Sequence, residues 1–351
     1  MTSSVNAIRG GTVESRHQVS AVAVDPDGKL VGWTGDPDLV TFWRSCAKPF
    51  QALPLITGGG ADALGVTDEE IALACASHNG ELRHVAVATS LLRKAGCVED
   101  DLACGPHPSL SPAVARAMAE RGQKPRKLHS NCSGKHAAML AQARFGGWPT
   151  ADYRKPAHPV QQRALEEVAR WTGVPTERIA VGTDGCGVVS FALPLRAMAL
   201  AYAGLGSARP PDGPSVEGAA PGSSHARPPA RSTVVAAAQR VIRAITADPF
   251  LIAGTGRLCT EIISSSRGRV IAKVGAEGVY CAAIPEARLG VAMKVEDGDG
   301  ESARPALVAL LEILAPGAVR LAESFRTPPI RNTLGEDVGH LEARISLQRA
   351  H

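Results

Sequence analysis

A serine followed three residues later by a lysine lies near the start of the chain. Ser45 and Lys48 belong to the run R-S-C-A-K-P, and Pro49 favours the first turn of a helix, where its missing N–H is not needed. Ser45 would then lie at a helix N-terminus, where the dipole and free N–H groups stabilise a developing alkoxide. A lysine held neutral by burial could take the hydroxyl proton. The pattern predicts a serine nucleophile for acyl transfer, although it also fits an ordinary N-cap.

Two further segments could complete such a site. The run C-A-S-H-N-G-E places Ser77 between two expected helices as a candidate second hydroxyl. Lys273 lies on a late strand beside a glycine, which resembles the strand lysine that flanks the cleft of S-x-x-K enzymes. The alternatives are a turn over 77–80 in which Asn79 caps the helix at Glu81, and an exposed strand lysine.

Two more segments gather cysteines with other polar side chains. The run H-S-N-C-S-G-K-H places Cys132 and Lys135 at helical spacing, and it fails as a phosphate-binding P-loop because His136 replaces the required Ser or Thr. The run G-T-D-G-C-G contains Asp184 and Cys186 among glycines, which indicates close approach of the backbone to another group. Cys186 could complete a metal site with Cys132, and Asp184 could hold an ammonium group.

The third metal ligand is less obvious from chemistry. A lysine amine must lose its proton before it binds a metal, so His136 would be the expected choice rather than Lys135. Without a metal, the first run is a capped helix start with a packed histidine, and the second is a tight turn between two apolar segments.

The elements that must position these residues follow from local patterns. A D-P-D-G turn within 12–34 predicts a hairpin, and alternating apolar residues predict strands at 269–274, 279–284 and 290–295. Helical patterns fill the middle of the chain, at 67–74, 81–95, 111–121, 137–145, 159–172 and 234–247. The expected fold class is therefore α/β in the α+β sense, with an antiparallel sheet built from both termini and a helical middle region.

Three regions are expected. Residues 1–43 and 232–351 would form a sheet-containing α/β region, and residues 44–205 a mainly helical region that carries most of the site motifs. Residues 206–231 are rich in Pro, Gly and Ser and nearly free of large apolar side chains. Such a segment cannot offset its ordering entropy, so we predict a flexible insert.

Composition excludes several classes of protein. A net charge of +4 over 351 residues and an aromatic content of 4% argue against a nucleic-acid partner. No segment has the length and apolarity of a membrane span, and the N-terminus lacks the apolar region of a signal peptide. The eight cysteines show no C-x-x-C spacing, so we expect free thiols and a cytoplasmic location.

Taken together, the motifs resemble one family, the asparaginase II family of thermolabile, Rhizobium-type L-asparaginases. The resemblance runs from residue 9 to beyond residue 278 and is specific because several unusual strings occur in the same order. The matching runs are R-G-G-T-V-E-S-R-H, R-S-C-A-K-P-F-Q-A-L-P, A-L-A-C-A-S-H-N-G-E, H-S-N-C-S-G-K-H-A-A-M-L, G-T-D-G-C-G, A-G-T-G-R-L-C-T-E and A-K-V-G-A-E-G-V.

The resemblance implies a fold similar to serine β-lactamases and glutaminases, and hydrolysis of L-asparagine to L-aspartate and ammonia. It implies that Ser45 is the nucleophile, paired with Lys48, and that Ser77 and Lys273 form a second Ser–Lys pair. The family commonly has Ser where Cys46 stands here, and we expect no functional change from this small residue.

The resemblance also implies a zinc ion held by Cys132, Lys135 and Cys186, with water or substrate completing the shell. Asp184 matches a substrate-binding acid, and Arg44 is expected in the same shell. A homodimer is expected as well.

Other functions share these residues. A glutaminase, a penicillin-recognising enzyme or another S-x-x-K acyl-transfer hydrolase would use the same serine and lysine, since fold does not settle substrate. A zinc-dependent amino-acid sensor without turnover would use only the metal site. The Cys–Lys–Cys cluster could also be a redox switch.

Overall fold

The computed structural model describes residues 3–211 and 229–349, which form two compact units. One unit, called the sheet unit below, consists of Met1–Cys46, Leu193–Ser207 and Glu261–His351. The other, called the helical unit, consists of Ala47–Ala192 and Ala208–Thr260. The expected combination of an antiparallel sheet from both termini with a helical middle region is confirmed.

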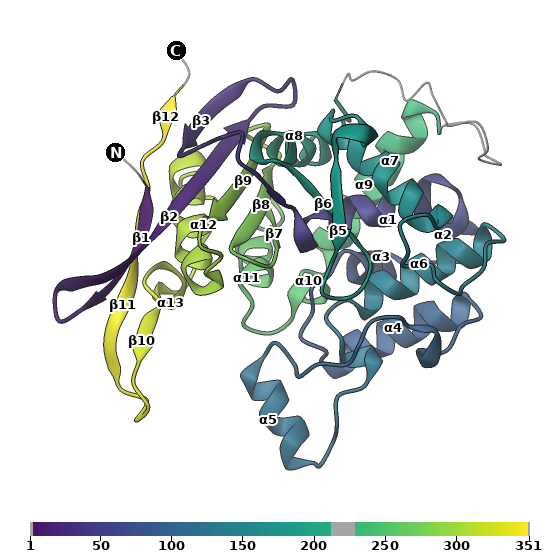
Figure 1. The fold of residues 1–351 in the computed structure, drawn as a ribbon, viewed down its shortest axis with the longest axis horizontal. Helices are drawn as coiled ribbons and strands as arrows, with labels where there is room; N and C mark the ends of the chain where they lie inside the picture. The colour runs from purple at the N-terminus through teal and green to yellow at the C-terminus, as the bar shows by residue number, and fades with distance from the viewer. Residues whose placement is uncertain (1–2, 212–228, 350–351) are drawn as a thin grey trace. The chain divides into compact units, whose positions relative to one another are not determined.

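The sheet unit is built on antiparallel strands from both ends of the chain (Figure 1). Their order along the main path is β10-β11-β1-β2-β9-β8-β7, and β3 joins β2 to β12. The strands are β1 (Ser4–Arg9), β2 (Thr12–Val24), β3 (Leu30–Thr34), β7 (Ile271–Val274), β8 (Val279–Ile284), β9 (Leu289–Val295), β10 (Pro329–Arg331), β11 (Asp337–Arg344) and β12 (Gln348–Arg349), with β4 (Val40–Phe42) preceding the first candidate motif.

Two helices cover the centre of this sheet. Every residue of β8 and β9 is buried, and because successive side chains point to opposite faces, both faces must be covered. Helices α8 (Leu195–Gly206) and α12 (Gly300–Leu314) both pack on these strands. Gly290 of β9 permits the close approach of α8, since a Cβ there would lie 1.9 Å from the carbonyl oxygen of Ala199.

The helical unit packs its helices around a common centre. Helix α1 contacts α6, α7 and α9, and α3 contacts α4, α6 and α9. The helices are α1 (Lys48–Thr57), α2 (Gly60–Ala63), α3 (Asp68–Ala74), α4 (Leu82–Lys94), α5 (Pro112–Glu120), α6 (Ser133–Phe145), α7 (Pro159–Thr172), α9 (Arg231–Ala247) and α10 (Phe250–Ala253). Strand β5 (Ala180–Thr183) pairs with β6 (Val189–Pro194), which crosses the unit boundary, as does α11 (Leu258–Ser265). The sheet unit also holds α13 (Glu323–Arg326).

Local signals explain where these helices begin. Thr67 and Glu70 form a reciprocal capping box at the start of α3, and acidic side chains fill its first turn. Pro159 opens α7, and Gly173 ends it in a left-handed conformation at φ +68°. The predicted helix at 159–172 therefore matches the observed one.

The unit boundaries differ from the expected regions. Residues 193–205 were expected in the helical region, but α8 packs on the sheet. Residues 232–260 were expected with the sheet, but α9 packs on α1 and α3. Both helices are largely apolar on their buried faces, so sequence alone could not tell which partner each would cover. Most of the expected insert at 206–231 lies outside the described residues.

Candidate functional site

The turn that carries Ser45 has a strained backbone. Arg44–Ala47 form a 3₁₀ turn, and α1 follows at once with Pro49 in its first turn, as predicted. Arg44 adopts φ +52°, a left-handed conformation that costs energy for a residue with a Cβ. Such strain persists only where the surroundings enforce it, and it often occurs at functional sites. Arg44 Nη1 also lies 3.8 Å from Glu277 Oε1.

This turn is fixed to the strand that carries Lys273. Cys46 Sγ donates to the Lys273 carbonyl oxygen at 3.0 Å, and the Tyr202 hydroxyl donates to the Cys46 carbonyl oxygen at 2.8 Å. Gly275 makes the contact close, because a Cβ there would lie 3.2 Å from both Cys46 Sγ and the Trp43 carbonyl oxygen. Cys46 thus has a structural role that a serine hydroxyl could also fill. Burial raises the pKa of its thiol.

Lys273 is a buried lysine on β7 rather than an exposed one. Its side chain is almost fully enclosed, and Nζ donates to the Val274 carbonyl oxygen at 3.0 Å. The alternative of an exposed strand lysine is therefore wrong. Within the sheet unit, the Cys46 hydrogen bond joins the turn that carries Arg44 and Ser45 to the backbone of Lys273.

Lys48 and Ser77 meet in the interior of the helical unit. The fully buried Lys48 Nζ lies 3.0 Å from Ser77 Oγ and donates to the Ala76 carbonyl oxygen at 2.5 Å. A third acceptor, the Asn131 carbonyl oxygen, lies at 3.4 Å. Burying an amine is costly unless it is hydrogen-bonded, so these oxygens explain how the lysine is tolerated. The predicted pairs were Ser45 with Lys48 and Ser77 with Lys273. Each pair has one member in each unit, because Ser45 and Lys273 belong to the sheet unit and Lys48 and Ser77 to the helical unit.

The segment after Ser77 differs from the simple turn considered above. Helix α4 begins at Leu82 with Glu81 in the N-cap position, so the reading of Asn79 as the cap is wrong. The Asn79 amide instead donates to Glu81 Oε1 at 3.1 Å. Ser77 and Asn79 are both buried, which shows that the segment is part of the core.

His78 joins this segment to the start of α6. Its Nδ1 accepts the Gly80 N–H at 3.1 Å, so Nε2 carries the proton and donates to Ser133 Oγ at 3.1 Å. The Ser133 hydroxyl in turn donates to the Leu128 carbonyl oxygen at 3.0 Å. Burial lowers the pKa of His78 well below its usual value, so the ring is neutral. The Ser77 segment and α6 are therefore held in a fixed register.

The start of helix α6 holds two of the three predicted metal ligands. Gly134 lets this helix approach the end of α3, because a Cβ there would lie 2.4 Å from the Leu73 carbonyl oxygen. Cys132 precedes the helix and Lys135 lies in its first turn, and both are buried. This close packing against α3 therefore explains the glycine before Lys135, and no phosphate-binding loop is needed to account for it.

Cys132, Lys135 and Cys186 converge as predicted. Lys135 Nζ lies 3.0 Å from Cys186 Sγ, and Asp184 Oδ2 lies 3.4 Å from that sulfur and 3.9 Å from the lysine. A hydrogen bond from the Cys132 thiol, aided by the Lys135 charge, lowers the pKa of Cys186 to about 5. The same bond, together with burial, raises the pKa of Cys132 to about 12. Cys186 is thus a thiolate at neutral pH.

This donor set fits zinc in its chemistry. Two sulfur atoms and one nitrogen lie together, one sulfur is already deprotonated, and thiolate is a preferred zinc ligand. Over residues 3–211 and 229–349, no three His, Cys, Asp or Glu side chains are arranged to hold a metal ion. A zinc site here therefore depends on Lys135, whose pKa the charges of Cys186, Cys132 and Asp184 raise despite its burial.

His136 does not join the two cysteines, so the choice of His136 as third ligand is wrong. Its Nδ1 lies 2.6 Å from the Tyr153 hydroxyl, which also accepts the Ala103 N–H at 2.9 Å. The Tyr153 hydroxyl can then donate its own proton to Nδ1 of His136. Burial lowers the pKa of His136 to about 3, so the ring is a neutral core side chain.

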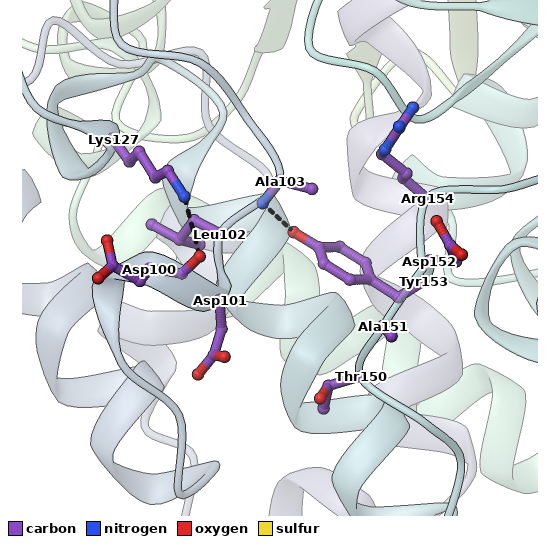
Figure 2. Close-up of a pocket in the computed structure, with 10 residues that line it drawn as sticks. All are labelled: Asp100, Asp101, Leu102, Ala103, Lys127, Thr150, Ala151, Asp152, Tyr153 and Arg154. Carbon is purple, nitrogen blue, oxygen red and sulfur yellow. Dashed lines mark hydrogen bonds between the residues drawn. The ribbon is translucent and has the colours of Figure 1, made fainter.

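A hollow lies beside Tyr153 in the helical unit (Figure 2). It has a volume of about 380 Å³ and is lined by two segments, 100–103 and 150–154, together with Lys127. Lys127 Nζ donates to the Asp100 carbonyl oxygen at 2.8 Å. None of the predicted site residues lines this hollow, and the hydroxyl of Tyr153 is what connects its wall to His136.

The structure is thus an α+β protein with a buried Ser–Lys contact and a Cys–Lys–Cys cluster. The chain belongs to the L-asparaginase II family, whose family model matches residues 5–343. The family resemblance inferred from the motifs is therefore confirmed over nearly the whole chain. Family membership supports an amidohydrolase that acts on an amino-acid substrate.

The similarities to solved structures are remote. No functionally curated protein matches the sequence. Among solved structures, one of Mglu matches with a TM-score of 0.45 and 16% identity, covering 86% of this chain and 69% of that one. A structure of native Mglu in 4.3 M NaCl matches with a TM-score of 0.36, also at 16% identity, over 84% of this chain and 60% of that one.

The described helices include none that is long and apolar enough to cross a membrane. None of the eight cysteines, each within the described residues, forms a disulfide.

Proposed function

We propose that the protein is an L-asparagine amidohydrolase that converts L-asparagine and water to L-aspartate and ammonia. The observation that carries this proposal is the buried 3.0 Å contact between Lys48 Nζ and Ser77 Oγ in a chain that the family model matches almost throughout. A lysine at a serine hydroxyl is the arrangement that Ser–Lys acyl-transfer enzymes use to move protons.

In the proposed reaction, the Ser45 hydroxyl attacks the side-chain amide carbon of asparagine. Lys48 takes the hydroxyl proton, and the proton then passes to the departing nitrogen, which leaves as ammonia. Water hydrolyses the resulting ester to release aspartate and restore Ser45. Ser77 and Lys273 form a second Ser–Lys pair that relays protons. The strain at Arg44 supports a functional role for the Ser45 turn.

Substrate binding in this proposal falls to Asp184 and Arg44. Asp184 would hold the ammonium group of asparagine, and Arg44 would contact the substrate beside Ser45. A zinc ion would be held by Cys132, Lys135 and Cys186, and when bound it would polarise or orient the substrate as a Lewis acid. Holding zinc requires Lys135 to give up its proton, which the neighbouring Cys186 thiolate and Asp184 carboxylate oppose because they favour the ammonium form.

The direct test is ammonia release measured in parallel with L-asparagine, L-glutamine and a β-lactam. We expect ammonia from L-asparagine in preference to L-glutamine, and no β-lactam hydrolysis. Faster release from L-glutamine would make the protein a glutaminase. Asparagine binding without turnover would make it a sensor. The homodimer and the cytoplasmic location stay predictions, and light scattering of the purified protein would test the first.

A further inference from the structure

A second segment of the helical unit runs along Ser77. The Ser77 N–H donates to the Ile252 carbonyl oxygen at 2.9 Å, and the Asn79 N–H donates to the Ala253 carbonyl oxygen at 2.9 Å. The chain then turns sharply at Gly254, which has φ +110° and ψ −172°, a conformation that is almost exclusive to glycine. The position of the Ser77 backbone therefore depends on the position of the segment 252–257.

Glu81 fastens this second segment to the first. Its Oε1 accepts the Thr255 N–H at 2.8 Å, and its Oε2 accepts the Thr255 hydroxyl at 2.9 Å. Gly254 has to be glycine for a second reason, since a Cβ there would lie 2.5 Å from Glu81 Oε1. Although partial burial opposes it, the hydrogen bonds from Thr255 and Asn79 lower the pKa of Glu81, so the carboxylate is ionised.

Asn79 is the junction between the two segments. Its side-chain oxygen accepts from Arg257 Nη1 at 2.8 Å. Its side-chain nitrogen donates to Glu81 Oε1 at 3.1 Å and to the Thr255 carbonyl oxygen at 3.2 Å. Both ends of this fully buried amide are thus engaged by the protein. Asn79 therefore serves the structure around Ser77 rather than a substrate.

We propose that Glu81 is a positioning residue that holds Ser77 in place against Lys48 by clamping the segment 252–257 to it. The clamp is defined as Glu81 with Asn79, Thr255 and Arg257. It rests on the proposed function, in which Ser77 relays protons. Catalytic geometry is sensitive to such support, because a misplacement of about 1 Å can cost on the order of 10²-fold in rate.

The sequence contained one signal for this clamp. The run A-G-T-G-R has two glycines within three residues, which indicates a turn, but nothing in it names a partner. Glu81 is separated from Thr255 by 174 residues, so the contact is visible only in the folded chain.

The test compares Glu81→Leu with Glu81→Gln in the full-length protein. Leucine keeps the approximate volume of the side chain and removes every hydrogen bond of the Glu81 carboxylate. Glutamine can still accept the Thr255 N–H and form a hydrogen bond with the Thr255 hydroxyl. For Glu81→Leu we expect kcat on L-asparagine to fall by about 10- to 100-fold with KM within about threefold, as for lost transition-state positioning. Glu81→Gln should restore most of kcat. Leucine and glutamine at the exposed Glu120 of α5 are the matched controls.

Hydrogen–deuterium exchange gives a readout that needs no activity. In Glu81→Leu, the Ser77 and Asn79 amides should exchange faster than in the native protein, because their acceptors lie in the released segment. Where Glu81→Leu does not fold, Thr255→Val removes the hydroxyl bond alone, and we expect a smaller loss of kcat, about three- to tenfold.

The outcomes separate this inference from the proposed function. Unchanged exchange, an unchanged kcat in Glu81→Leu, or a Glu81→Gln variant as impaired as Glu81→Leu would each overturn the positioning role. Faster exchange in a protein whose native form releases no ammonia from L-asparagine would support the clamp and refute the proposed function.

Discussion

The chemistry of single residues here depends on what surrounds them. Cys132 and Cys186 are the same residue type, yet a hydrogen bond between them raises the pKa of one to about 12 and lowers that of the other to about 5. Lys135 contributes a neighbouring positive charge that favours the Cys186 thiolate. The Cys186 sulfur is thus already in the deprotonated form that binds a metal.

Ser45, the proposed nucleophile, is the first residue to test. Ser45→Ala should lower kcat on L-asparagine by about 10³-fold or more, as for other nucleophile deletions, because no other hydroxyl replaces the lost bond. The circular-dichroism spectrum should be unchanged. Ser90→Ala on α4 is the control. Near-native turnover in a folded Ser45→Ala protein, with loss of activity in Ser77→Ala, would instead make Ser77 the nucleophile.

Removing either proposed sulfur ligand should release zinc. Cys186→Ser and Cys132→Ser are each expected to lower the zinc content of the purified protein and to raise KM for L-asparagine, since a serine hydroxyl is a poor zinc ligand. Elemental analysis and steady-state kinetics give the two measurements, with the buried Cys97→Ser as control. Full zinc occupancy in both variants would contradict the Cys–Lys–Cys site, as would zinc-free native enzyme that is fully active.

At the scale of elements, close backbone contacts decide where the site residues lie. Helix α6 reaches the end of α3 because Gly134 has no side chain, and His78 ties the Ser77 segment to the same helix. The Cys–Lys–Cys cluster and the Ser77–Lys48 contact therefore both lie at the start of α6, through Cys132 and the Asn131 carbonyl oxygen.

Gly134→Ala should destabilise the protein. Alanine gains about 1 kcal/mol of helix propensity over glycine. That gain is outweighed by a Cβ placed 2.4 Å from the rigid Leu73 carbonyl oxygen. We expect a net loss of about 1–3 kcal/mol in the free energy of unfolding, typical of overpacking. Urea denaturation would measure it.

Gly105→Ala, in the same unit, is the matched control, since nothing lies within 4 Å of its Cβ position and it is exposed. Its effect should stay within about 0.5 kcal/mol. Equal stabilities for the two variants would show that α6 can shift away from α3 without cost.

At the scale of the whole molecule, buried histidines link stability to pH. His78 stacks on His84 with ring centroids 4.8 Å apart, and burial lowers the pKa of both rings. In the unfolded chain each regains a pKa of about 6.5. Between the folded and unfolded values the unfolded state binds more protons, so stability falls as pH drops below about 6.5.

We therefore expect the free energy of unfolding to decrease from pH 7.5 to pH 5. Replacing His78 with Asn should make that dependence shallower by up to about 1.4 kcal/mol per pH unit, whatever its effect on stability at neutral pH. The exposed His340→Asn is the control and should leave the slope unchanged. A His78→Asn protein with the native slope would show that His78 does not contribute to the pH dependence.

Much of the fold could be predicted because its signals are local. Pro159 and Gly173 mark the two ends of α7, and the D-P-D-G turn predicts the β2–β3 hairpin. The strand at 279–284 was predicted to the residue. The first strand, the C-terminal strands and α12 were not predicted, and α8 and α9 were assigned to the other region. An apolar face signals that a helix is buried but does not specify against what.

The sequence by itself determined the family and the set of candidate residues, since residue types in a rare order need no coordinates. The tertiary structure decided which of them touch. It placed Lys48, 29 residues away in sequence, at Ser77, and it joined Cys132 and Lys135 to Cys186. It also turned His136 to Tyr153 and away from the cysteines. Such contacts arise from the packing of distant segments, which local periodicity and spacing do not encode.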